Sequence, residues 1–455
     1  MKNLLLLFVF FIPISAFAQY ENYKLEDYVN PDYKRQELDF KFNLGGDISS
    51  WKQQNRGWDY IWSRNNESIA GNANIAYHKW KNSLEFQGLT AISSSISGAY
   101  DNKEEDNSAI KSNDIRASID FSHTGLYYSN DKKFIEFSPY AGFIYQDMND
   151  KDKNSDYQLK TEWDNLNIHV GFRIGIGKGR IEYVEDARQA VYILQDLQEK
   201  GLLKKILTDD EVNAFARQMT SVKMKRQFDS RIRLIEEISA VDSFLVANGY
   251  IDNTHSAPYF TSLYDNWMYA GLIRRQSGSR FSVGLRPGYY YSQNKHKQNY
   301  TPLREGLANH DYKNYNSDIR GALYADYKYE KPENLYWQRS AEISADVNLG
   351  KVRNNDSNNL ESQLYGAYSI GYYPNSRTSI SGGVSEYLYY NNYNNFISTV
   401  TSLGIDIYYY LSPQLRISGD CGLSYNFSRY VDDNYNMYNK YPNISFGASL
   451  TYSIF

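Results

Sequence analysis

Six histidines are the residues of this chain with the clearest capacity for acid–base chemistry. His310 precedes Asp311, and an imidazole beside a carboxylate is a pair that hydrolases combine with a nucleophile. Both residues lie in a polar stretch, so we interpret them as ordinary loop residues. The sequence has no Gly-rich phosphate loop, no cysteine cluster and no HExxH zinc motif. We therefore expect no catalytic residues, no metal site and no cofactor, and we do not expect an enzyme.

The dominant pattern of the chain is an alternation of apolar and polar residues. In the last segment, even-numbered positions are apolar and odd-numbered positions are small and polar. This period of two predicts strands that each have one apolar and one wet face. The apolar set of that segment is Ile444, Phe446, Ala448, Leu450, Tyr452 and Ile454.

The chain opens with the features of an export signal. Lys2 is followed by an apolar stretch over 4–14, and Ala16-Phe17-Ala18 fits a cleavage site, so we predict a signal peptide over 1–18. The remaining chain has no apolar run long enough for a helical membrane span. Alternating strands in an exported chain are typical of outer-membrane β-barrels. The 45 tyrosines suit the membrane–water interface, although a secreted glycan-binding β-domain is an alternative explanation.

Strand patterns predict an all-β membrane barrel of about 14 antiparallel transmembrane strands, with 12 and 16 left open. Residues 19–35 form a polar periplasmic tail, 36–177 form strands one to six, and 279–455 form strands seven to fourteen. Charged stretches at 101–113 and 146–157 are interpreted as long outer loops, alternating with short turns. This alternation places the sixth strand's end, and the segment after it, in the periplasm.

Residues 178–272 have a helical period and are predicted to form a periplasmic helical insert. Val184, Ala187, Val191 and Leu194 recur at helical spacing, and Thr208 with Glu211 forms a capping box. An aromatic-rich helix follows Ser256. We hypothesise that its aromatic residues gate the periplasmic mouth; the alternative is a self-packed cap. The candidate gate residues are Tyr259, Phe260, Trp267 and Tyr269.

Charged residues of both signs share the lumen parity of the predicted strands. One hypothesis is a transverse field that selects solutes. The alternative is cross-strand ion pairing that allows charges inside a barrel. The net charge of −4 gives no indication of a nucleic-acid partner. The lumen selectivity candidates are Arg116, Arg173, Arg286, Arg320, Arg416, Glu136, Glu342, Asp346 and Asp420.

With its Ala16-Phe17-Ala18-Gln19 signal end, Tyr-rich strands and terminal Phe455, the chain resembles outer-membrane β-barrel proteins of the Bacteroides and Flavobacterium type. The segment Gly179–Gly249 looks like a helical insert that such barrels carry. The resemblance implies location in the cell outer membrane, contact with its lipid, and insertion by the outer-membrane assembly machinery.

The leading hypothesis for function is a porin-like channel for small hydrophilic solutes. The alternative from another class is a structural or assembly barrel whose helical insert docks a periplasmic partner. A third hypothesis is an outer-membrane hydrolase that uses His310 or His169.

Overall fold

The computed structural model describes residues 20–452, except for 21, 31, 55–60, 106–107, 130–131, 154–156, 226–232, 253–255, 270–274, 303–307, 352–357, 393–394, 413–414 and 433–434. The predicted signal peptide and the terminal Phe455 lie outside the described residues.

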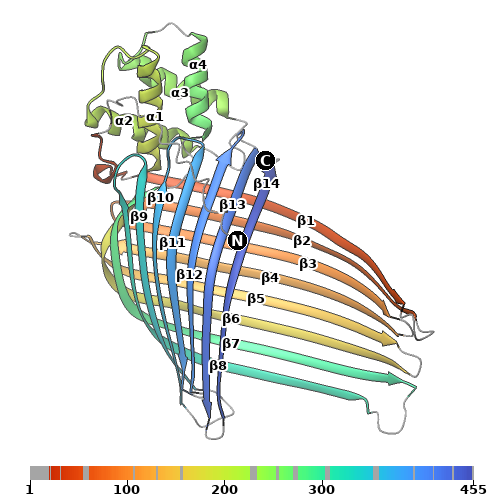
Figure 1. Ribbon diagram of the computed structural model, residues 1–455. Coiled ribbons are helices and arrows are strands. Elements are labelled where there is room, and N and C mark those ends of the chain that lie inside the picture. Colours follow the sequence, from red (N-terminus) through yellow and green to blue (C-terminus); the bar gives the residue numbers. More distant parts are fainter. Residues whose placement is uncertain are drawn as a thin grey trace, which may run out of the picture.

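Fourteen strands form one antiparallel sheet in which each strand pairs with the next along the chain, as the alternating pattern predicts (Figure 1). The sheet curls into a barrel-like wall. Within the described residues, β1 pairs only with β2 and β14 only with β13, so closure between β1 and β14 stays a prediction. The strands are β1 (Asp32–Gln54), β2 (Ile61–Ser83), β3 (Phe86–Glu105), β4 (Ser108–Tyr128), β5 (Lys133–Lys153), β6 (Gln158–Tyr183), β7 (Gln276–Thr301), β8 (His310–Pro332), β9 (Trp337–Lys351), β10 (Asn358–Tyr372), β11 (Thr378–Asn391), β12 (Phe396–Tyr410), β13 (Leu415–Asp432) and β14 (Tyr435–Tyr452).

The wall is uneven, because β1 to β8 are 20–26 residues long and β9 to β14 only 14–18. Crossing a bilayer takes about 9–11 residues of a tilted strand, so β1 to β8 are about twice the length that a crossing needs. The prediction of long charged loops at 101–113 and 146–157 was wrong. Ladder pairing continues to Glu105↔Ser108 and Lys153↔Gln158, where neither face of the strands is apolar and periodicity gives no signal.

Four helices lie between β6 and β7, at the barrel end where β1 begins (Figure 1). The capping box at Thr208 is present as predicted. Ser256 Oγ accepts from Tyr259 N at 3.3 Å and so caps the predicted aromatic-rich helix. β6 continues to Tyr183 and β7 begins at Gln276, so both strands pass their predicted limits. No helix among the described residues is long and apolar enough to cross a membrane. The helices are α1 (Glu185–Glu199), α2 (Asp209–Lys223), α3 (Leu234–Ala247) and α4 (Ala257–Tyr269).

Candidate functional site

A continuous apolar belt covers the outward face of the sheet. On β5, Ile135 is 58% exposed and Phe143 is 38% exposed. From Ile135 to Tyr145, a rise of about 3.3 Å per residue at a tilt of about 45° spans roughly 23 Å, which is the height of a lipid-facing band. The other strands expose apolar residues on the same face: Phe40, Ile75, Ile92, Ile119, Val170, Leu285, Leu323, Ile343, Leu364, Val384, Leu403, Leu423 and Ile444.

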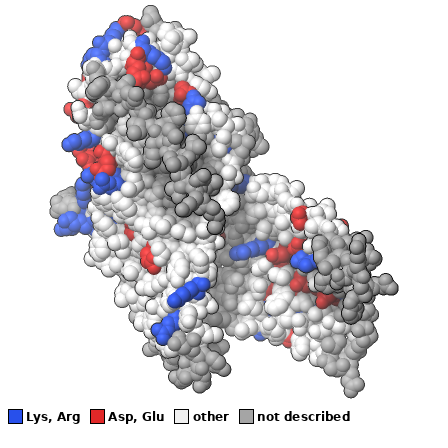
Figure 2. All heavy atoms as spheres, viewed as in Figure 1, with Lys and Arg blue, Asp and Glu red and all other residues white. Residues whose placement is uncertain are grey.

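Aromatic residues with polar tips border this belt at both ends, as they do at the two interfaces of membrane barrels. Their rings stand on the outward face, and Figure 2 shows largely uncharged surface over the strands near the helices. Exposed examples at the helical end are Tyr127, Tyr327, Trp337 and Tyr409, and those at the other end are Tyr145, Tyr289, Tyr315 and Tyr425.

The inward face is polar, and its charges gather around Arg173 on β6. Arg173 Nε lies 3.3 Å from Glu136 Oε1 on β5, and the guanidinium also contacts Asp326 on β8. The Tyr324 ring centroid lies 3.8 Å from the guanidinium carbon, and Tyr324 Oη donates to Glu136 Oε2 at 3.0 Å. The positive and negative side chains therefore neutralise each other on this part of the inward face.

Two more of the predicted lumen arginines form ion pairs. Arg286 Nη2 lies 3.1 Å from Asp346 Oδ1, and Arg320 Nε lies 2.7 Å from Asp318 Oδ2. The structure thus brings together candidates from β5 to β9, whereas Glu342 of β9 and the candidates on β4 and β13 stand apart from these pairs. Their role in selecting solutes stays a prediction. In the described part of the chain, no ion pair includes Arg116, Arg416, Glu342 or Asp420.

Glycines on the lumen face make room for two tyrosine rings, which sequence reasoning missed. A Cβ at Gly175 would come within 2.3 Å of Tyr324 Oη, and one at Gly284 within 2.8 Å. The Tyr140 hydroxyl approaches the next inward glycine of β6, Gly171, in the same way, at 2.4 Å. The rings therefore lie in space that a larger residue on the neighbouring strand would need. The apolar–polar alternation of the sequence identifies these glycines only as small inward residues and does not show which ring lies against them.

Residues 20–30 fold together with α1 to α4, and we call this assembly the helical unit. Tyr20, Tyr23, Leu25 and Tyr28 are at most 5% exposed and belong to the helical core. Leu335, from the turn between β8 and β9, joins the same core. The predicted polar tail is therefore a folded part of the unit. Its buried residues follow neither period, so the sequence pattern gave no signal for their packing.

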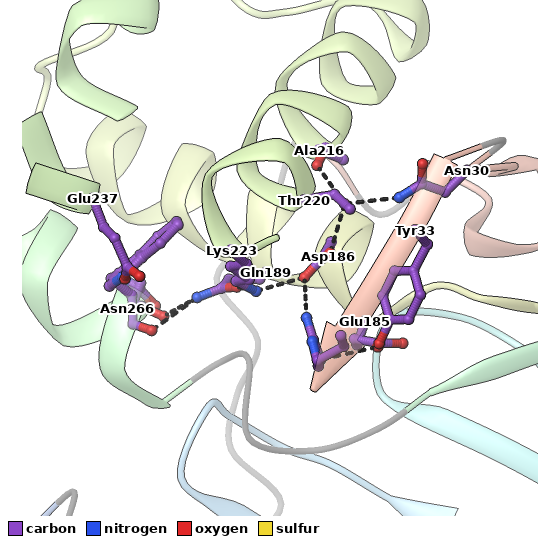
Figure 3. Close-up of polar contacts among 12 residues, drawn as sticks. Asn30, Tyr33, Glu185, Asp186, Gln189, Ala216, Thr220, Lys223, Glu237 and Asn266 are labelled. Atoms are coloured by element: carbon purple, nitrogen blue, oxygen red, sulfur yellow. Dashed lines mark hydrogen bonds and ion pairs between the residues drawn. The ribbon is translucent and has the colours of Figure 1, made fainter. Parts of the chain in front are cut away.

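A buried polar network fastens β1 to the helices (Figure 3). Asp186 of α1 accepts from Thr220 Oγ1 at 2.6 Å and lies 2.5 Å from Lys223 Nζ and 3.5 Å from Arg35 Nη2. Asn30 Nδ2 donates to Thr220 Oγ1 at 2.8 Å. Burial alone raises the pKa of Asp186, but Lys223 and Arg35 outweigh it and hold that pKa at about 2.

The predicted gate residues lie in three different environments. Tyr259 and Trp267 are 3% exposed and lie in the helical core, where Trp267 Nε1 donates to Glu237 Oε2 at 2.9 Å. Phe260 is 54% exposed. Tyr269 approaches the strands, with its ring centroid 6.2 Å from that of Tyr410 on β12. A gating role for these residues stays a prediction.

Two arginines attach the ends of the helical segment to hairpin turns of the barrel. Arg180 donates to Ser83 O at 2.7 Å and to Leu84 O at 3.0 Å, in the turn between β2 and β3. Arg275, 1% exposed, donates to Leu335 O at 2.9 Å and also to the carbonyls of Asn334 and Trp337. These turns lie six strands apart in the sheet order. The two chain segments that lead into and out of the helices are therefore bonded to two well-separated turns of the rim.

The histidines considered for hydrolysis lie apart. The His169 ring centroid is 6.3 Å from the rings of both Tyr140 and Tyr290, whereas His310 is exposed at the start of β8. Among the described residues, no group of three or more His, Cys, Asp or Glu side chains could hold a metal ion. Whether the chain has hydrolase activity stays untested.

Comparison with protein-family models and with curated proteins finds no match. Among solved structures, the translocator domain of autotransporter NalP from Neisseria meningitidis matches with 8% identity and a TM-score of 0.29, covering 78% of this chain and 82% of that one. The ferric yersiniabactin uptake receptor FyuA from Yersinia pestis matches with 6% identity and a TM-score of 0.39, covering 89% and 54%. OmpT of Vibrio cholerae matches with 8% identity and a TM-score of 0.26, covering 91% and 96%.

Within the described residues, the chain forms one large antiparallel sheet of 14 strands with four helices inserted between β6 and β7. An antiparallel sheet with one apolar and one polar face is the pattern of outer-membrane β-barrels.

Proposed function

We propose that the protein is an outer-membrane barrel that conducts small hydrophilic solutes, with the helical unit as a fixed cap at its periplasmic mouth. The observation that carries this proposal is the difference in polarity between the two faces of the sheet. Its outward face has a bordered apolar belt, and its inward face has polar groups with compensated charges. Lipid is the medium that satisfies the first face, and water satisfies the second.

A lumen wall of small polar residues supports conduction over a purely structural role. Ser and Gly recur at inward positions of β11 to β14, where they occupy little of the lumen, although inward tyrosines such as Tyr387 and Tyr408 lie among them. Examples are Ser381, Gly383, Ser402, Gly404, Ser418, Gly422, Ser445 and Gly447. A barrel of about 14 strands encloses water only if its interior side chains are small.

Planar-bilayer recording of the detergent-purified chain tests the proposal. We expect discrete conductance steps from protein that shows heat-modifiable mobility, which reports a folded barrel. Folded protein that gives no steps in repeated insertions would refute conduction and favour a structural barrel.

The cap is tested by deletion at the boundaries that the structure defines. Residues 185–269 are replaced by a Gly/Ser linker, and 20–30 are removed with them, because Tyr20 and Tyr28 would otherwise lose their core. Removing 20–30 alone is the control. Larger steps from a folded double deletion support a cap that restricts flow. Unchanged steps contradict a restricting cap and favour a docking role for the helices.

A further inference from the structure

Four side-chain amides form one rung across the inward face of β5 to β8. Gln146 pairs with Asn165, Asn165 with Asn294, and Asn294 with Asn314 in the ladder register. The next inward rung toward the belt holds Asn167, Ser292 and Asn316. Because strand side chains alternate between faces, all of these groups share the wall opposite the aromatic border of the belt.

Three of these four amides make no side-chain hydrogen bond within the described part of the sheet. In the described structure, Asn165, Asn294 and Asn314 take part in no side-chain hydrogen bond, and Gln146 donates to both carboxylate oxygens of Asp114 at 3.1 Å. Asn294 and Asn314 are exposed. Asparagine is also a poor strand former. The rung therefore costs strand propensity and leaves donors and acceptors accessible on the inward face of β5 to β8, beyond the point where β8 stops pairing with β9.

Aromatic rings border the amide rungs on both sides. On the outer side, the centroid of His296 lies 3.8 Å from that of Trp163 and 4.9 Å from that of Tyr312, and the three residues are paired in register. His296 is only 7% exposed, and neither of its ring nitrogens has a hydrogen-bond partner among the described residues. On the side toward the belt, His169 lies near Tyr290.

We propose that this wall of β5 to β8, which we call the amide wall, binds neutral saccharides. An amide offers two donors and an acceptor without charge, which matches hydroxyl groups that both donate and accept. The C–H faces of sugar rings pack on aromatic rings, whose polar edges remain available for hydrogen bonds. From Trp163 to His169 the wall extends about 20 Å along β6, at about 3.3 Å per residue, which accommodates more than one sugar ring.

This inference rests on the proposed function, because it names the solute class of the same lumen. The inward charges beside the rung are Asp114, which accepts from Gln146 Nε2 at 3.1 Å, and Arg116, which is paired with Gln146 in the ladder register. The four amides of the rung are uncharged, so a neutral solute is preferred to an ionic one only if they supply most of its contacts, and a charged probe tests this.

Binding is measured on the full chain in detergent by calorimetry, with maltohexaose and cellohexaose as probes and triglycine as the charged comparison. We expect saturable binding of at least one hexasaccharide and none of triglycine. Asn294→Ala, Asn314→Ala and Trp163→Ala should each weaken binding about three- to tenfold. Asn426→Ala, on the inward face of β13, is the matched control and should bind as the parent does.

Three results would overturn the amide wall: no hexasaccharide binding by folded protein, equal loss in the Asn426 control, or tighter binding of triglycine than of sugars. Sugar block of the ion current provides a second readout. Sugar binding by a protein that never conducts refutes the channel and leaves the amide wall. Conductance that no hexasaccharide binds to or blocks refutes the amide wall and leaves the channel. Heat-modifiable mobility of each variant confirms that the barrel is folded.

Discussion

Neutralising Asp186 should destabilise the helical unit more than any exposed charge change in it. Asp186 and Lys223 have side chains 2% and 5% exposed, and Arg35 is 16% exposed. Asp186→Asn keeps the shape and an acceptor for Thr220 but leaves the Lys223 ammonium buried without its carboxylate. Breaking a buried pair in this way costs about 3–5 kcal/mol. That is a large fraction of a domain stability of about 5–15 kcal/mol.

The assay is urea unfolding of the detergent-purified chain, followed by circular dichroism at 222 nm, where the helices dominate. With an m-value of about 1–3 kcal/mol/M, the midpoint should fall by at least about 1 M. The control is Asp252→Asn, which removes an exposed pair with Lys204 and should cost about 0–1 kcal/mol. Lys223→Met added to Asp186→Asn should recover much of the loss, because an apolar replacement removes the buried ammonium that faced the Asp186 carboxylate.

The same carboxylate gives a pH dependence with a definite sign. The pKa of Asp186 in the folded unit, about 2, lies below its ordinary value of 3.8. Its stabilisation is therefore complete above about pH 4 and is lost as the pH falls toward 2. Glu185 works in the opposite sense, because burial raises its pKa. Comparison with Asp186→Asn isolates the Asp186 contribution. Equal midpoints and equal pH profiles for the Asp186 and Asp252 variants would refute this account of the network.

Further predictions concern the attachments of the helical unit and the wall. Arg275→Ala leaves buried carbonyls without a donor and should make the unit more sensitive to protease, whereas Arg339→Ala, at an exposed pair, should not; equal cleavage rates would contradict this. Gly175→Val places a side chain against the Tyr324 hydroxyl and should lower the temperature at which the barrel unfolds on heat-modifiability gels. Gly45→Val, where a Cβ meets nothing within 4 Å, is its control, and an equal shift in both variants would contradict the proposed contact.

The sequence predicted the barrel-like sheet and its strand number well, because a strand with one lipid face and one wet face leaves a strict period of two. It also predicted the helical insert, since α2 begins with the Thr208 capping box and α1 has an apolar stripe. The sequence did not predict the structure of segments whose buried residues follow neither the strand period nor the helix period. The arms of β3 to β6 beyond the belt have polar residues on both faces, and Tyr23 and Tyr28 pack into helices more than 150 residues away in sequence.

The sequence predicted which face of the sheet carries the charged candidates, but not which residues they contact. Parity placed Arg173 and Glu136 in the lumen, and the ladder register made them neighbours, but the Asp326 contact spans two further strands. The amide rung was missed because each asparagine counts only as a polar residue in its own strand. Only the register between four strands shows that Gln146, Asn165, Asn294 and Asn314 line up.

The shared core of the helical unit sets an order of folding. Its buried residues come from the N-terminal segment, from the helices, and from Leu335 in a turn that follows β8. Contacts so distant in sequence carry a large loop-closure cost before they contribute stability, and they form slowly. The core is therefore complete only after β8 and β9 have paired and brought Leu335 into place. Until then, Tyr20, Tyr23 and Tyr28 are left without the finished core that buries them in the folded chain.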